Sequence, residues 1–254
     1  MKNGNVVLVV SVFLGVSLAL CFLCIGLFFL SGGTMDKALP NMPQEQAPPE
    51  TEKPKYTVII DAGHGGEDGG AVGADGLVEK ELNLDIAKRL AALLEQEGIG
   101  VIMTRTEDVL LYDRNTDYQG RKKVLDLAAR QAIGDANPDA VFISIHANTF
   151  SNPIYHGLQI WYGGKSPQSA CLAEQMRAEV VGTLQPDNHR QSKVAGSNIY
   201  LLYHLENPAV LVECGFLSNP AECKALGEDS YRQVLAHALC KGILAYYEHE
   251  DNAR

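Results

Sequence analysis

The sequence predicts an α/β fold: a single domain with a twisted, mostly parallel or mixed sheet of about six strands and helices on both faces. One N-terminal transmembrane helix is expected to precede it. Strand-like and helix-like segments alternate from Tyr56 onward without an internal repeat, which is typical of such a sheet. Several strand candidates are continuously apolar, as strands covered on both faces are. Hydrophobic residues make up 46% of the chain, enough for a substantial core.

The N-terminal helix is predicted from Val6–Leu30, an unbroken run of 25 uncharged residues. As a helix it would be about 37 Å long, whereas the hydrocarbon core of a bilayer is about 30 Å thick. A cleavable signal peptide has a shorter apolar region, and no small-residue cleavage site closes this run before Ser31. Lys2 favours a cytoplasmic N-terminus. We therefore expect residues 1–30 to form a cytoplasmic tip and an uncleaved signal-anchor, with the remainder outside.

The segment after the apolar run differs in composition. Residues 31–55 are rich in Pro, Gln and Glu and contain few large apolar side chains. Proline favours extended backbone, so this segment is expected to be a semi-extended tether. Residues 56–250 then form the predicted catalytic domain.

The strands of that domain are expected where short apolar runs lie between turn residues. The candidates are Tyr56–Asp61, Gly100–Thr104, Ala140–His146, Gly157–Tyr162, Asn198–Leu202 and Ala209–Cys214.

Helical spacing of apolar residues marks the helix after the first strand and the last helix. Leu82 is followed at offsets of 4, 8 and 11 by Ile86, Leu90 and Leu93, which places them on one helical face. Gly98 stands where that helix should end. The last helix repeats the spacing at Tyr231, Val234, Leu235, Ala238, Gly242 and Tyr246.

Charge and cysteine usage exclude some classes of function. The formal net charge is −10, which argues against a nucleic-acid partner because phosphate binding relies on clustered Lys and Arg. Of the six cysteines, four follow the apolar run without a C-x-x-C pair, so neither a zinc ribbon nor a dense disulfide framework is indicated. One bridge, between Cys214 and Cys223, stays open as an alternative.

The first candidate functional residue is His64, in the glycine-rich segment Asp61–Gly66 directly after an apolar strand. Ligands of open α/β sheets bind at that edge. A dinucleotide-binding loop is excluded, because Asp68 stands where the third glycine of G-x-G-x-x-G belongs. The alternative is an ordinary polar loop histidine.

His146 and Glu79 are the next candidates. His146 closes an apolar strand, where its ring nitrogens need partners that a metal or a hydrogen bond in the core could supply. Glu79 heads the first helix, where the helix dipole favours a carboxylate, so capping alone could also explain it.

Glu213 interrupts the apolar strand Ala209–Val212. A carboxylate in such a strand costs several kcal/mol unless it is paired, hydrogen-bonded or near a metal. Such a group is a candidate for a shifted pKa and for acid/base catalysis.

Two histidines and a glutamate form a familiar catalytic zinc set that leaves the fourth position for water. We therefore predict His64, Glu79 and His146 as Zn²⁺ ligands and Glu213 as the general base. The other histidines, His156, His189, His204, His237 and His249, are interpreted as structural or solvated.

Five motifs occur in a fixed order along the domain: Ile60–Gly66, Glu79–Lys80, Thr104–Arg105, Ser144–Asn148 and Val212–Asn219. Together they resemble the zinc-dependent N-acetylmuramoyl-L-alanine amidase type 3 family, from about Tyr56 to Tyr247. The resemblance implies a single α/β domain with zinc at His64, Glu79 and His146 and a catalytic glutamate at Glu213.

Softer features resemble the amidases of this family that take part in muramic-δ-lactam formation in the spore cortex. These features are the N-terminal anchor, Asp126–Arg130, Asn188–Gln191 and Ile199–Leu202. Two departures from the family pattern are the wide spacing between Arg130 and Asn137 and the lack of a wall-binding repeat.

The resemblance implies zinc-dependent hydrolysis of the amide between N-acetylmuramic acid and L-alanine in peptidoglycan. Asp61 could then orient a zinc ligand, or merely cap its strand. The domain would lie outside the cytoplasmic membrane, in the cell wall or the intermembrane space of the forespore, and a muramic acid deacetylase would be a functional partner. A zinc peptidase acting on wall peptides and a catalytically silent, membrane-tethered wall-binding protein are the alternatives.

Overall fold

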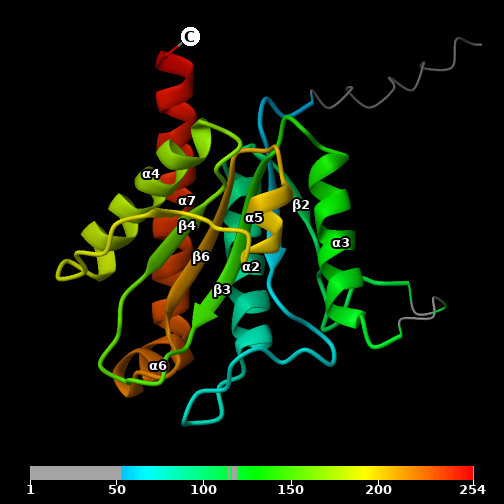
Figure 1. The fold of residues 1–254 in the computed structure, drawn as a ribbon. Helices are drawn as coiled ribbons and strands as arrows, with labels where there is room; N and C mark the ends of the chain where they lie inside the picture. The colour runs from blue at the N-terminus through cyan, green and yellow to red at the C-terminus, as the bar shows by residue number, and fades with distance from the viewer. Residues whose placement is uncertain (1–52, 114, 116–118, 254) are drawn as a thin grey trace, which may run out of the picture. The chain divides into compact units, whose positions relative to one another are not determined.

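The computed structural model describes residues 53–113, 115 and 119–253, and these contain a six-stranded mixed sheet with helices on both faces (Figure 1). The sheet order is β2-β1-β3-β6-β4-β5. Strands β2, β1, β3 and β6 are mutually parallel, β4 is antiparallel to β6, and β5 is parallel to β4. The strands are β1 Thr57–Ala62, β2 Gly100–Met103, β3 Val141–Asn148, β4 Gln159–Tyr162, β5 Lys193–Val194 and β6 Ala209–Phe216. The predicted mixed sheet is confirmed.

The helices divide between the two faces of the sheet. The helices are α2 Glu79–Gln96, α3 Lys122–Asp135, α4 Gln168–Leu184, α5 Tyr200–His204, α6 Pro220–Gly227 and α7 Asp229–Asn252. Side chains of α2, α4 and α7 form one core cluster with alternate residues of the strands, among them Val58 and Ile60. Residues of α3 and α5 pack on the opposite face, around Ile59 and Phe142. The apolar runs are continuous because each strand is buried on both faces.

Helix α2 follows the predicted spacing with a small difference. Leu82, Ile86 and Leu90 are buried as expected, but the fourth buried leucine is Leu94, while the side chain of Leu93 is only partly buried. Burial of each such side chain contributes about 1.5–3 kcal/mol to stability. Gly98 adopts a φ of 75° just after the helix, the left-handed conformation that ends helices.

One predicted strand is wrong. Asn198–Leu202 is not a strand, because Tyr200–His204 forms helix α5, in which Leu201, Leu202 and the following Leu205 are buried against the second core cluster. A short apolar run fits a buried helix turn as well as a strand. The sixth strand is instead β5, Lys193–Val194, two exposed residues at the sheet edge. Because this strand has only two residues and both are exposed, the sequence shows no apolar pattern that would predict it.

The disulfide left open between Cys214 and Cys223 is absent, since both are free thiols, as are Cys171 and Cys240. The Cys223 thiol instead donates to Asp75 Oδ1 at 2.9 Å.

The predicted membrane anchor, Val6–Leu30, and most of the tether lie outside the described residues. Within the described ranges, no helix is long and apolar enough to cross a membrane.

Candidate metal centre and active site

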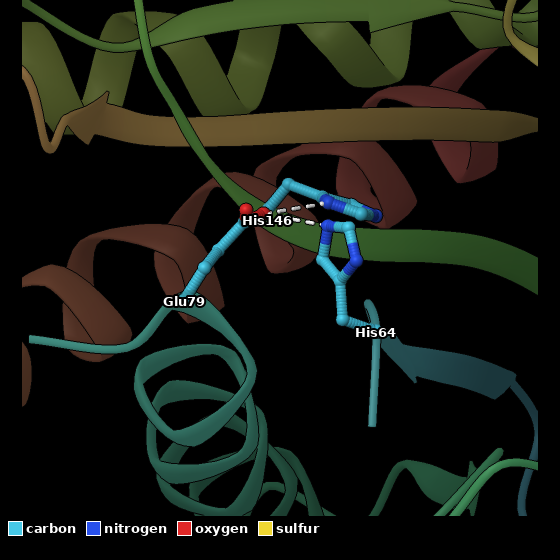
Figure 2. A group of neighbouring side chains, drawn as sticks. All are labelled: His64, Glu79 and His146. Atoms are coloured by element: carbon cyan, nitrogen blue, oxygen red, sulfur yellow. Dashed lines mark hydrogen bonds and ion pairs between the residues drawn. The ribbon is translucent and has the colours of Figure 1, made fainter. Parts of the chain in front are cut away.

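The three predicted metal ligands come together at the carboxyl edge of the sheet (Figure 2). Glu79 Oε1 lies 3.1 Å from His64 Nε2 and 3.0 Å from His146 Nδ1. The two imidazole rings are 4.9 Å apart and meet at 75°. The three side chains come from the loop after β1, the first turn of α2 and the end of β3. Residues separated by up to 82 positions in the sequence thus form one group of ligand atoms within 4.8 Å of one another.

The loop after β1 has an unusual backbone that aims His64 at this group. His64 adopts a φ of 62°, which non-glycine residues rarely take, and Gly65 and Gly66 also have positive φ. Gly63 is required for a different reason, because a Cβ atom there would lie 2.2 Å from His146 Nε2. The glycine-rich loop therefore serves close packing of the two histidines.

Glu79 is held by hydrogen bonds as well as by its position. Its Oε2 accepts from the Ala71 N–H at 2.7 Å, and its Oε1 accepts from the Ala147 N–H at 3.2 Å. Burial raises the pKa of Glu79, but hydrogen bonds to His146 and His64 outweigh it and hold the pKa far below the ordinary range. Glu79 is therefore an ionised carboxylate, the form that binds a cation.

His64 also faces Asp68, whose Oδ2 lies 2.9 Å from His64 Nδ1. The distance is that of an ion pair, but the angle is not that of a hydrogen bond, and Nδ1 is buried without a hydrogen-bond partner among the described residues. Burial lowers the pKa of His64, while Glu79 and Asp68 raise it by more, so the net shift is upward. Sequence reasoning missed Asp68 as a neighbour of the site.

Asp61 does not touch either histidine ring through a hydrogen bond. Its carboxylate accepts from Ser144 Oγ at 2.6 Å, from Thr104 Oγ1 at 2.8 Å and from the Arg130 guanidinium. Arg130 in turn donates to the backbone carbonyl of His64 at 2.7 Å. Asp61 therefore supports the backbone of the His64 loop through Arg130, without a hydrogen bond to a ligand ring.

Arg130 is 1% exposed and lies between two carboxylates, since it also pairs with Asp126 at 2.8 Å. Arg105 holds the same loop from the other side by donating to the carbonyls of Ala62 and Gly63 at 2.8 and 3.0 Å. A buried guanidinium group is costly unless its N–H groups are hydrogen-bonded. Arg130 and Arg105 both donate to carbonyl groups of the His64 loop, and together they fix its backbone.

Glu213 lies on β6 directly opposite His146 on β3. Part of its side chain reaches the surface, yet Oε2 is buried and has no hydrogen-bond partner within the described part of the chain. Burial, opposed by His146 and reinforced by Glu79, raises the pKa of Glu213 to about 7. A carboxylate with this pKa exchanges protons near neutral pH, as a general base must.

The histidines interpreted as structural lie outside this group. His204 and His237 bond backbone carbonyls of their own helices. His249 is exposed, its Nδ1 lies 3.6 Å from Cys171 Sγ, and with Glu250 these residues form a second group of ligand atoms within 4.8 Å of one another. Cys171 lies 78 positions from His249, so the sequence pattern does not reveal this group.

The donor set suits a zinc ion. Tetrahedral coordination at about 2.0–2.1 Å places ligand atoms roughly 3.3 Å apart. The separations of 3.0 and 3.1 Å from Glu79 Oε1 to the two histidine nitrogens are close to that value. Two imidazoles and a carboxylate beside a buried carboxyl of near-neutral pKa define the class: a hydrolytic enzyme with a metal-binding site at the edge of an α/β sheet.

Comparisons with known proteins specify the class further. The family model described as N-acetylmuramoyl-L-alanine amidase matches residues 58–245. The chain is 36% identical over 190 residues to the germination-specific N-acetylmuramoyl-L-alanine amidase of Bacillus subtilis, covering 75% of this chain and 79% of that protein. The chain belongs to the N-acetylmuramoyl-L-alanine amidase family, and its enzyme class is that of a peptidoglycan amidase, a cell-wall hydrolase. The predicted family and the predicted enzyme class are both confirmed.

Solved structures share the fold. The CwlD amidase from Clostridioides difficile, determined in complex with the GerS lipoprotein, is similar with a TM-score of 0.72 and 37% identity over 76% of this chain and 99% of that one. The amidase AmiC2 of Nostoc punctiforme is similar with a TM-score of 0.64 and 33% identity over 76% of this chain and 97% of that one.

Proposed function

We propose that this amidase uses zinc, held by His64, Glu79 and His146, to hydrolyse the amide that joins N-acetylmuramic acid to L-alanine in peptidoglycan. The observation that carries the proposal is the convergence of these three side chains beside Glu213. The lactyl carbonyl of muramic acid would be the electrophile, and the α-amine of L-alanine the leaving group.

Zinc supplies Lewis acidity for the scissile carbonyl and lowers the pKa of water when it is bound. Glu213 accepts the proton of the attacking water and then returns it to the departing amine. A carboxylate suits both steps only if its pKa is near the working pH, and burial raises the pKa of Glu213 to about 7.

The remaining residues of the site act on the ligands. Arg130 and Arg105 fix the carbonyls of the His64 loop, and the N–H of Ala147 fixes the Glu79 carboxylate. Rigid ligands reduce reorganisation when the metal binds and when charge develops in the transition state.

Metal analysis of the full-length protein tests the zinc proposal. We expect one zinc per chain by elemental analysis, lost in a His64→Ala variant and retained in a Glu213→Gln variant. Zinc bound equally by the His64→Ala variant, or a different metal that supports full activity while zinc does not, would contradict it.

We further propose a role in the spore cortex, in muramic-δ-lactam formation. The similarity to a germination-specific amidase and to CwlD supports it. On this proposal residues 1–30 anchor the protein in the membrane, and the catalytic domain lies outside the cytoplasmic membrane, in the cell wall or the intermembrane space of the forespore. A muramic acid deacetylase would act on the glycan exposed by the amidase, and a lipoprotein like the one bound to CwlD would be a physical partner.

A further inference from the structure

A cleft of about 230 Å³ lies at the sheet edge occupied by Glu213. It is lined by Asn148, Phe150, Tyr155, Gln159, Trp161, Arg190 and Phe216. We call it the arginine cleft. Pockets that enclose a whole small ligand measure about 300–1,000 Å³, so the arginine cleft suits one portion of a larger substrate.

Strand register joins the arginine cleft to the catalytic residues. Glu213 is paired with His146 on one side and with Gln159 on the other. Paired residues point to the same face of a sheet, so these three side chains share one face at its edge. Asn148 and Trp161 lie two positions along their strands from His146 and Gln159 and therefore share that face too. The arginine cleft thus begins beside the general base.

Among the residues that the structure describes, Arg190 is the only charged side chain that lines the arginine cleft. Its guanidinium lies 5.0 Å from the ring of Phe216 and 5.7 Å from that of Tyr155, and its Nε donates to the carbonyl of His156 at 3.0 Å. Among the described residues, none accepts a hydrogen bond from its two terminal nitrogens. A guanidinium held by its Nε and by two aromatic rings presents its remaining N–H groups as a fork for a carboxylate.

Other charges near Arg190 leave this fork available. The Glu222 carboxylate accepts from the backbone N–H groups of Phe216 and Gly157 at 2.8 Å each, and no ion pair joins it to Arg190. A second cation, Lys193 Nζ, lies 5.9 Å from the Trp161 ring. Arg190 and Lys193 are thus two cations at this end of the sheet, in a protein whose formal net charge is −10.

The hollow on the other side of the metal ligands has the opposite character. It is lined by His64 and His146 together with three carboxylates, Asp61, Asp68 and Asp126, against two cations, Lys123 and Arg130. Among these lining side chains carboxylates outnumber cations, whereas the cleft on the other side presents the Arg190 guanidinium, so an anionic portion of the substrate is attracted to Arg190. The glycan portion of the substrate carries no carboxylate once muramic acid is joined to the peptide, so the anionic portion is the peptide.

We propose that the arginine cleft binds the peptide side of the substrate, and that Arg190 pairs with a carboxylate on the residue that follows L-alanine. This inference rests on the proposed function. The aromatic walls would cover the apolar parts of the peptide, and the amides of Asn148 and Gln159 would bond its backbone. Binding here directs the scissile amide toward Glu213 and the metal ligands.

Two synthetic substrates test the inference: N-acetylmuramoyl dipeptides whose second residue ends in a free carboxylate or in the matching carboxamide. Full-length protein in detergent is compared with Arg190→Gln, which keeps N–H donors but removes the charge, and with Arg177→Gln. Arg177 is the matched control, because it pairs with Glu174 on α4, and α4 packs on the face of the sheet opposite to the one that carries Trp161 of the arginine cleft.

The wild-type protein should have a kcat/KM about tenfold higher for the carboxylate substrate, since a charge-assisted hydrogen bond has that order of effect. Arg190→Gln should reduce this ratio to about one by slowing only the carboxylate substrate, while Arg177→Gln keeps the wild-type ratio. Zinc content should be equal in all three proteins.

Other outcomes overturn the inference in distinguishable ways. The arginine cleft does not recognise the carboxylate if the wild type cleaves both substrates equally. The same conclusion follows if Arg190→Gln keeps the tenfold preference or slows both substrates alike. In each of these cases the amidase function stands. If the wild type cleaves neither substrate while it holds zinc, the proposed function fails and the inference fails with it.

Discussion

Glu213 on β6 and His146 on β3 face each other across parallel strands, at the edge where both strands end. This pairing places a buried carboxyl group beside a candidate metal ligand through the backbone ladder alone. The register shifts between His146 and Asn148, an irregularity of the kind that is common next to active sites, and pairing resumes at Asn148 and Phe216. The backbone hydrogen bonds of the sheet thereby fix the positions of the two residues relative to each other.

Removal of the proposed base should separate catalysis from metal binding. Glu213→Gln keeps the shape of the side chain but cannot accept a proton, so we expect kcat to fall at least 100-fold, in line with the loss of general base catalysis. His64→Ala should lose zinc and turnover together. Steady-state kinetics and elemental analysis of both variants check this, and wild-type turnover by Glu213→Gln would reject Glu213 as the base.

Gly63→Ala should disturb the centre by steric conflict. The new methyl group would lie 2.2 Å from His146 Nε2, so the imidazole or the loop must move. We expect zinc affinity to fall at least tenfold. Gly182→Ala on α4 is the matched control, since a Cβ there meets nothing within 4 Å. That substitution should stabilise the helix by about 0.5–1 kcal/mol and leave zinc binding unchanged. Equal zinc affinity in the two variants would show that Gly63 has no role in packing the histidines.

Arg130→Met should cost far more stability than an ordinary arginine substitution. It leaves Asp61 and Asp126 buried without their cation, and breaking a buried ion pair costs about 3–5 kcal/mol. Arg177→Met, at a surface pair on α4, should stay within about 0.5 kcal/mol of wild type. Chemical denaturation followed by circular dichroism measures both values.

The same network predicts how stability depends on pH. Burial raises the pKa of Asp61, but Arg130 and the Ser144 hydroxyl outweigh it, and the net shift is downward. A carboxyl group with a lowered folded-state pKa stabilises the protein above its unfolded pKa, about 3.9, and this contribution is lost as the pH falls through the folded value. Free energies of unfolding measured from pH 6 to pH 3 should fall, and Asp61→Asn should show a shallower decline.

Activity should depend on pH through Glu213. Burial raises its pKa to about 7, and a bound cation lowers it, so the acidic limb of kcat/KM should fall at or below pH 7. Below that limb the rate should decrease tenfold per pH unit, because the base is protonated. A rate that stays constant down to pH 4 would remove Glu213 from this role.

Much of the fold and the centre could be predicted from single residues, because each had a local signal. Continuous apolar runs marked five strands, and polar residues at the ends of those strands marked His64, His146 and Glu213. The helical turn at Tyr200–His204 and the exposed strand Lys193–Val194 lacked such a signal, since one is a short apolar run and the other has no apolar residue pattern.

The supporting residues of the site were harder to predict because their roles depend on convergence. Arg130 lies 69 positions from Asp61, and Arg105 bonds carbonyl groups that carry no sequence signal. The spacing of Asp126 and Arg130 fits an i, i+4 pair on a helix surface. Only the fold shows that this pair is buried against the loop of His64.

The central claim is that the protein is a zinc amidase that cuts between muramic acid and L-alanine. Mass spectrometry of the products that the full-length protein releases from purified peptidoglycan, with zinc and with a chelator, tests it most directly. The account predicts free stem peptides that begin at L-alanine and disappear on chelation. Cuts inside the stem peptide, or products unchanged by the chelator, would contradict it.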